Sequence, residues 1–185
     1  MAIQLLRHRF SVEEYHRMGQ AGIFSEDARV ELIEGEILEM TPIGSRHAAQ
    51  VARLTDVLTF LLQRHAIVWV QNPVQLGSTI EPQPDLCVLR RRPDFYANAH
   101  PGPDDILLVI EVADTSLEFD RTVKIPLYAR TGIHEAWLVD TSGSIEVHRG
   151  PTQEGYRDMQ RAAHGQRLTV EAFPDLSFPV DELLL

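Results

Sequence analysis

The sequence is poor in cysteine and in long apolar runs, and each shortage excludes a class of protein. Cys87 is the only cysteine among 185 residues, which excludes an internal disulfide framework and a cysteine-rich zinc site. No apolar run approaches the roughly 20 residues that a membrane-spanning helix needs. The first nine residues also lack the apolar core of a signal peptide. We therefore expect a cytoplasmic protein that does not enter a membrane.

Positive charge is also in short supply. The chain has 17 Lys and Arg against 27 Asp and Glu, which gives a formal net charge of -10 at pH 7. A protein that holds nucleic acid through broad phosphate contacts is usually basic. Any nucleic-acid binding by this chain would therefore depend on local positive patches, metal ions or a partner.

The length and the 44% hydrophobic content predict one domain over residues 1–185, with a core at about 29–149. Capping boxes at Ser11/Glu14 and Thr115/Glu118 mark two expected helix starts. The apolar periodicity and the turn residues predict the elements in chain order. They are a helix over 11–20, a β-hairpin over 29–40 turning at Glu34-Gly35, a helix over 46–64, strands at 68–71 and 74–76, a loop over 90–105, a helix from about 116 to Gly132 disturbed by Pro126, a hairpin over 135–148, a strand near 156–160 and a short helix from about Val180.

Two apolar runs of strand length each carry one carboxylate. Asp85 begins the run 85–89, and Glu111 stands near the end of the run 107–112. A lone carboxylate in a buried strand is costly unless a charge or a metal compensates it. The loop between the runs has no helical pattern, which favours antiparallel pairing. That pairing would bring the two acids together, whereas parallel pairing would leave them at opposite ends of the strands.

Two adjacent carboxylates at a sheet edge form a hard-oxygen site suited to Mg²⁺ or Mn²⁺. Such an ion offsets their repulsion and lowers the pKa of a bound water. Lys124, on the helix expected after the second strand, could reach back to orient this water or to stabilise negative charge on a phosphate.

Simpler interpretations compete at most of these positions. Asp85 could cap a turn, Lys124 could be solvated or pair with Asp120, and Glu31 could face water instead of joining the acids. His47 heads the apolar stripe of its helix and is interpreted as a core-edge histidine, and Tyr128 as a packing residue. Arg90 to Arg92 resemble a phosphate patch but follow the far end of the Asp85 strand, so they form either a solvated loop or a DNA contact away from the chemistry.

As a set, these residues resemble the Uma family of restriction-like endonucleases in the PD-(D/E)XK nuclease superfamily. The match runs in order over roughly residues 11 to 180, although each motif alone is weak. Its segments are VELIEGE at 30–36, His47, QPDL at 83–86, EVAD at 111–114, Asp120 with Lys124, LYARTGI at 127–133 and WLVD at 137–140.

The resemblance implies an α/β (α+β) fold with a restriction-endonuclease-like core. This is a mixed β-sheet flanked by helices, preceded by an N-terminal helix and a β-hairpin. It also implies hydrolysis of DNA phosphodiester bonds with Mg²⁺ or Mn²⁺, and a homodimer. Asp85, Glu111 and the Val112 backbone carbonyl would hold the ion and Lys124 would position the attacking water, with Glu31 and His47 as further candidates.

One position departs from the superfamily motif. The lysine usually lies two residues after the second acid, where this chain has Ala113. The expected activity therefore requires Lys124 to take that role from the helix. Two alternatives stay open: a non-catalytic binding or assembly module with the nuclease fold, and a metal-dependent hydrolase of small phosphoesters, which would suit an acidic surface.

Overall fold

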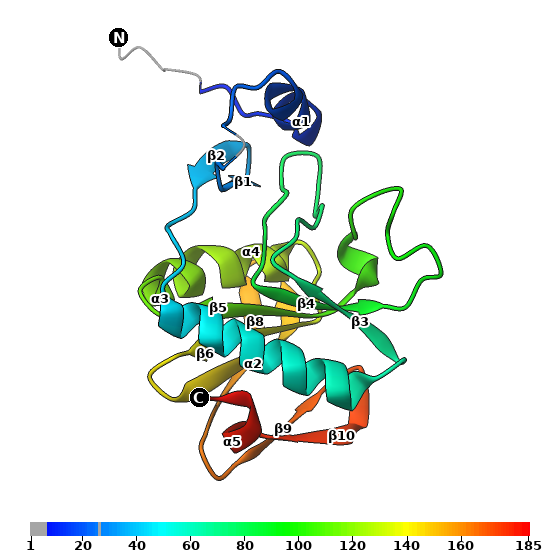
Figure 1. The fold of residues 1–185 in the computed structure, drawn as a ribbon, viewed down its shortest axis with the longest axis vertical. Coiled ribbons are helices and arrows are strands. Elements are labelled where there is room, and N and C mark those ends of the chain that lie inside the picture. The colour runs from blue at the N-terminus through cyan, green and yellow to red at the C-terminus, as the bar shows by residue number, and fades with distance from the viewer. Residues whose placement is uncertain (1–6, 26) are drawn as a thin grey trace.

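The computed structural model describes residues 7–25 and 27–185 (Figure 1), so the expectation about the first nine residues lies mostly outside its described part. The strands are β1 (Val30–Ile33), β2 (Glu36–Glu39), β3 (Ala66–Val70), β4 (Leu86–Arg90), β5 (Ile106–Ala113), β6 (Glu135–Asp140), β7 (Ser144–Thr152), β8 (Gly155–Ala163), β9 (Arg167–Val170) and β10 (Phe173–Pro179). The helices are α1 (Val12–Gln20), α2 (Ser45–Leu62), a 3₁₀ turn (Pro103–Asp105), α3 (Leu117–Phe119), a π-helix (Asp120–Lys124), α4 (Ile125–Arg130) and α5 (Val180–Leu183).

A mixed six-stranded sheet forms the centre of the described fold. Its strand order is β3-β4-β5-β6-β7-β8. The β5–β6 pair is parallel and the other neighbours are antiparallel, because the β5–β6 connection crosses over through α3, the π-helix and α4 while the other links turn back directly. This arrangement confirms the expected mixed sheet flanked by helices.

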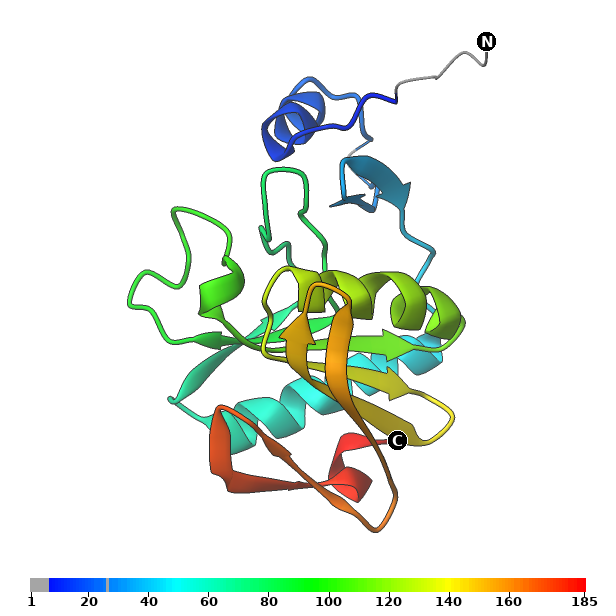
Figure 2. The ribbon, with the colours of Figure 1, turned by 180° about the vertical axis from the view of Figure 1, so that it is seen from behind.

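Helices cover both faces of the sheet, as the two opposite views show (Figures 1 and 2). The helix α2 lies on one face, and its apolar stripe of Val51, Leu54, Leu58 and Leu62 is buried as the periodicity predicts. The α5 helix and the β9–β10 hairpin complete the core on this side. The α4 helix lies on the other face, where Tyr128 and Leu127 are fully buried. The strands β4 and β5, which position Asp85 and Glu111, therefore pack against apolar side chains on both faces of the sheet.

The N-terminal helix and hairpin gather at one end of this sheet (Figure 1). The capping box of Ser11 and Glu14 is formed, and α1 follows it. The antiparallel β1–β2 hairpin turns at Glu34 and Gly35, both with positive φ, as a tight hairpin requires. Both expectations are confirmed. Among the described helices, none combines the length and apolar character of a membrane span.

The helical segment after β5 differs from the expectation in its N-cap and contains a π-helix. Thr115 forms no cap; the N-cap is Ser116, which makes no side-chain bond to the helix backbone. The expected disturbance by Pro126 is confirmed as a π-helix directly before it, in which the Ile125 N–H donates to the Asp120 carbonyl. Proline lacks an N–H, so the ladder opens here instead of continuing as an α-helix. The α4 helix ends at Arg130 with Thr131 as its C-cap, and Gly132 follows with positive φ at the predicted C′ position.

One predicted strand is absent from the structure, and one hairpin in the structure was not predicted. Residues 74–76 form no strand, because Val74 and Leu76 donate their N–H groups to the returning side of their own loop, at Pro82 and Ile80. The second error was an omission. The β9–β10 hairpin was not predicted, since residues 167–179 alternate weakly and contain two prolines.

Candidate active site

The antiparallel β4–β5 pair places the two predicted acids at the same edge of the sheet. Leu86 pairs with Ile110, so Asp85, directly before β4, comes opposite Glu111 on β5. The Val112 N–H donates to Asp85 Oδ2 at 2.9 Å, which joins the two segments at this point. The favoured antiparallel pairing is confirmed.

Glu111 is buried against a lysine and a tyrosine from the crossover helix. Glu111 is 2% exposed, and its Oε1 lies 3.3 Å from Lys124 Nζ and accepts a hydrogen bond from the Tyr128 hydroxyl. Burial raises the pKa of Glu111 to about 8, although the Lys124 ammonium opposes this shift. The ionised form of the Glu111 carboxyl group is therefore strongly disfavoured unless additional positive charge lies nearby.

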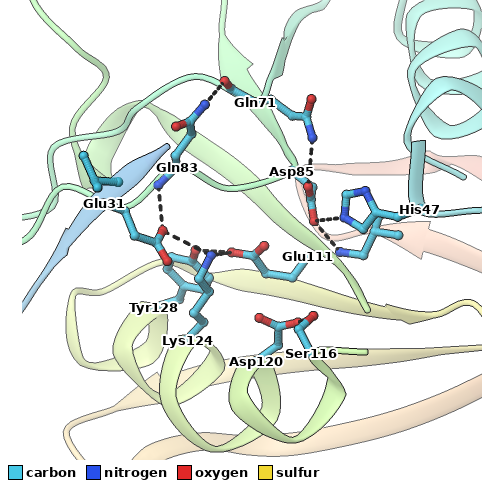
Figure 3. Close-up of polar contacts among 12 residues, drawn as sticks. Glu31, His47, Gln71, Gln83, Asp85, Glu111, Ser116, Asp120, Lys124 and Tyr128 are labelled. Carbon is cyan, nitrogen blue, oxygen red and sulfur yellow. Dashed lines mark hydrogen bonds and ion pairs between the residues drawn. The ribbon is translucent and has the colours of Figure 1, made fainter. Parts of the chain in front are cut away.

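Lys124 is the only lysine in the sequence, and it is 5% exposed. Its Nζ lies 3.2 Å from Glu31 Oε2, in addition to its contact with Glu111. Burial would lower the pKa of Lys124, but the Glu111 and Glu31 carboxylates outweigh burial and hold that pKa above its ordinary value. The ammonium is thus a fixed positive charge inside the cavity (Figure 3).

The π-helix explains how Lys124 reaches this position. The wider turn places Asp120 and Lys124 together on the buried side of the helix, where both line the cavity. Asp120 Oδ2 accepts a hydrogen bond from Ser116 Oγ at 2.5 Å. Burial raises the pKa of Asp120, opposed by that bond. At the superfamily position, Ala113 lies in the apolar cluster with Ile125 and Tyr128 instead.

Asp85 is held by neutral and basic donors rather than by the lysine. His47, in the first turn of α2, places Nε2 at 3.1 Å from Asp85 Oδ2, and Gln71 donates to Oδ1 at 3.3 Å. The hydrogen bond to Asp85 raises the pKa of His47. The interpretation of His47 as a simple core-edge histidine was therefore incomplete, since its ring contacts the candidate metal ligand.

All six predicted site residues line one cavity of about 530 Å³. They are Glu31, His47, Asp85, Glu111, Val112 and Lys124. Glu31 is 4% exposed, so the alternative that it faces water is wrong. Tyr128 was interpreted as a packing residue alone, but its hydroxyl donates a hydrogen bond to Glu111. The sequence feature that could have indicated this contact is the position of Tyr128, four residues after Lys124 on the same helical face.

The charges of the cavity favour a cation. Six carboxylates line it against the two basic residues Arg29 and Lys124. Four of the six, Glu31, Asp85, Glu111 and Asp120, are buried. Excess buried negative charge is unfavourable unless a cation compensates it, and oxygen donors are those that Mg²⁺ and Mn²⁺ prefer. The donor set therefore fits a divalent ion.

Arg90 and Arg91 are exposed and Arg92 is half-buried, which agrees with the expected solvated loop. Arg92 binds Asp94 at 2.8 Å, and Arg90 donates to the Asp104 carbonyl. None of the three arginines lines the cavity.

Comparison with known proteins decides the family. The model of the family described as "Uma2: Putative restriction endonuclease" matches residues 12–181. The chain belongs to the Uma2 family. This Uma2 chain also resembles a solved structure titled a "putative nuclease belonging to DUF820 from Anabaena variabilis ATCC 29413", with a TM-score of 0.74 and 18% identity over 94% of this chain and 97% of that one. At that identity the likeness shows the fold. The curated proteins include no match to the Uma2 chain.

Proposed function

We propose that this Uma2 chain is a divalent-metal-dependent endonuclease that hydrolyses DNA phosphodiester bonds. The observation that carries the proposal is the convergence of Asp85, Glu111 and Lys124 on one acidic cavity, although they come from three different elements. The family description and the nuclease fold support the same class of reaction.

Asp85, Glu111 and the Val112 backbone carbonyl would hold Mg²⁺ or Mn²⁺. When bound, the ion supplies a Lewis acid for the phosphoryl oxygens and a water of lowered pKa. His47 and Gln71 keep the Asp85 carboxylate in one orientation through its two oxygens. Tyr128 does the same for Glu111 from the opposite wall. These contacts preorganise the oxygen donors, as a hydrolytic site requires.

Lys124 would act on the phosphate and on the attacking water. The Lys124 ammonium nitrogen lies within ion-pair distance of Glu31 and Glu111 and lines the cavity. Its three N–H donors would be available to a water or a phosphate oxygen there. A fixed positive charge in a site with little water stabilises the negative charge that develops on phosphorus oxygens. Glu31 is then a positioning residue, because it holds the amine without contacting the substrate.

Plasmid cleavage with Mg²⁺ or Mn²⁺ tests the proposal. Removing one electrostatic stabiliser from an active site typically costs about 10²- to 10³-fold in rate. We expect losses of that size for Asp85→Asn and Lys124→Met, while Asp175→Asn, an exposed acid on β10, retains wild-type activity. EDTA should abolish cleavage.

Three outcomes would overturn the proposal: no cleavage of any DNA by the wild type, activity that persists in EDTA, or an active Asp85→Asn variant. Circular dichroism of each variant confirms that lost activity does not reflect unfolding. Lys124→Arg provides a further check on the lysine. A guanidinium keeps the positive charge but cannot fit the same small space, so we expect it to rescue only a minor part of the activity.

A further inference from the structure

A second group of metal-binding side chains lies outside the active-site cavity. His16 on α1, Glu81 in the β3–β4 loop and His100 in the β4–β5 loop each place one ligand atom within 4.8 Å of the others. These residues are far apart in the sequence and meet only in the fold. None of them lines the cavity of Glu111 and Lys124.

Backbone contacts fix two of the three positions. Glu81 forms a β-bridge with Leu32 of β1, in which each N–H donates to the other carbonyl, at 2.8 and 3.1 Å. The α1 helix is joined to the same loop because the Val12 N–H donates to the Ser78 carbonyl at 2.8 Å. His16 is therefore presented next to Glu81 by structure that does not depend on the two side chains. Both loops extend from one end of the sheet toward α1 (Figures 1 and 2).

The Glu81 carboxylate lacks a full set of partners. Its side chain is 3% exposed, and Oε1 lies 2.6 Å from His16 Nε2. The second oxygen, Oε2, is buried and accepts no hydrogen bond from any residue in the described part of the chain. A buried carboxylate oxygen without a partner is costly. A cation bound between Glu81 and the two imidazoles would supply the missing partner.

We propose that His16, Glu81 and His100 form a Zn²⁺ site that fastens α1 to the two loops. Two imidazoles and one carboxylate are ligands that suit Zn²⁺, whereas Mg²⁺ prefers the all-oxygen donors of the other cavity. Zn–ligand bonds of about 2.0–2.1 Å place tetrahedral ligands about 3.3 Å apart. His16 and His100 are exposed, so small side-chain rotations bring them to that spacing. Water fills the fourth position.

Zinc titration calorimetry on the tag-free, chelator-treated full chain, with excess Mg²⁺ present, tests this site. Loss of even an outer-shell partner costs about 10- to 100-fold in metal affinity. We therefore expect His100→Ala and His16→Ala to weaken one Zn²⁺ equivalent by at least about a hundredfold. His134→Ala, an exposed histidine elsewhere, is the matched control and should bind Zn²⁺ as the wild type does. Asp85→Asn should also keep this equivalent, which separates it from binding in the active-site cavity.

Hydrogen exchange tests directly whether Zn²⁺ attaches α1 to the β3–β4 and β4–β5 loops. Zn²⁺ should slow amide exchange in α1 (Val12–Gln20) of the wild type and leave it unchanged in His100→Ala, which alters an exposed loop residue and should not unfold the protein. Equal zinc affinity in the wild type and both histidine variants would overturn the proposal. Absence of zinc binding at micromolar concentrations, or zinc binding without protection of α1, would overturn it as well.

Discussion

Replacing Lys124 by methionine should destabilise the metal-free protein strongly. The ammonium lies 3.2 Å from Glu31 and 3.3 Å from Glu111. At an effective dielectric constant of about 20, each contact corresponds to about 5 kcal/mol of attraction, which offsets a desolvation cost of several kcal/mol per ion. Removing one partner of a buried ion pair typically costs about 3–5 kcal/mol, because the remaining charge is left uncompensated. We expect a loss of about that size in the free energy of unfolding.

Urea unfolding in EDTA at pH 9, above the Glu111 pKa of about 8, measures this loss through the fluorescence of Trp69 and Trp137. The double variant Glu111→Gln/Lys124→Met tests its origin. It removes one of the two acids that face each other once the ammonium is gone, so it should be more stable than Lys124→Met alone. A loss below about 1 kcal/mol, the range of exposed ion pairs, would refute the buried pairing. A double variant no more stable than the single one would refute its electrostatic origin.

Three further outcomes follow from the buried groups. Acylation should leave Lys124, the single lysine, unmodified in the native protein and modify it only after unfolding, because it is 5% exposed; mass spectrometry of the peptide that contains Lys124 measures this. Tyr128→Phe removes a donor to Glu111 and should lower the free energy of unfolding in urea by about 1–3 kcal/mol; an unchanged value would contradict this role of the hydroxyl. Burial lowers the pKa of His148 below its ordinary 6.5, opposed by the Glu146 carboxylate. The unfolded chain then binds more protons, so stability should fall as the pH drops below about 6.5, and His148→Gln should show a smaller loss between about pH 7.5 and about pH 5.5.

Local patterns were sufficient for much of the fold. The Ser11/Glu14 box, the Glu34-Gly35 turn and the stripe of α2 each depend on neighbours within a few residues, and each is present as expected. The pairing of β4 with β5 was also predictable, because a connection without a helix favours antiparallel strands. The signal in these segments is carried by their own residues.

The rest depended on tertiary contacts that sequence spacing does not encode. Asp85 and Glu111 could be brought together by strand pairing, but the burial of Glu31 depends on how the separate β1–β2 hairpin lies against the sheet edge. The π-helix could be anticipated only as a disturbance near Pro126, not as the turn that brings Asp120 and Lys124 to one side. Tyr128 looks apolar in sequence context because its hydroxyl partner is 17 residues away.

The lysine between Glu31 and Glu111 has a mechanical consequence. The β1–β2 hairpin shares no ladder with the six-stranded sheet, yet it supplies one of the two carboxylates that balance the amine. Pulling the hairpin outward would leave the ammonium with Glu111 as its remaining ion-pair partner among the described residues. Because such coupling is reciprocal, loss of the positive charge on Lys124 would weaken the attachment of the β1–β2 hairpin to the rest of the fold. The attachment of the β1–β2 hairpin and the protonation of Lys124 are therefore thermodynamically linked.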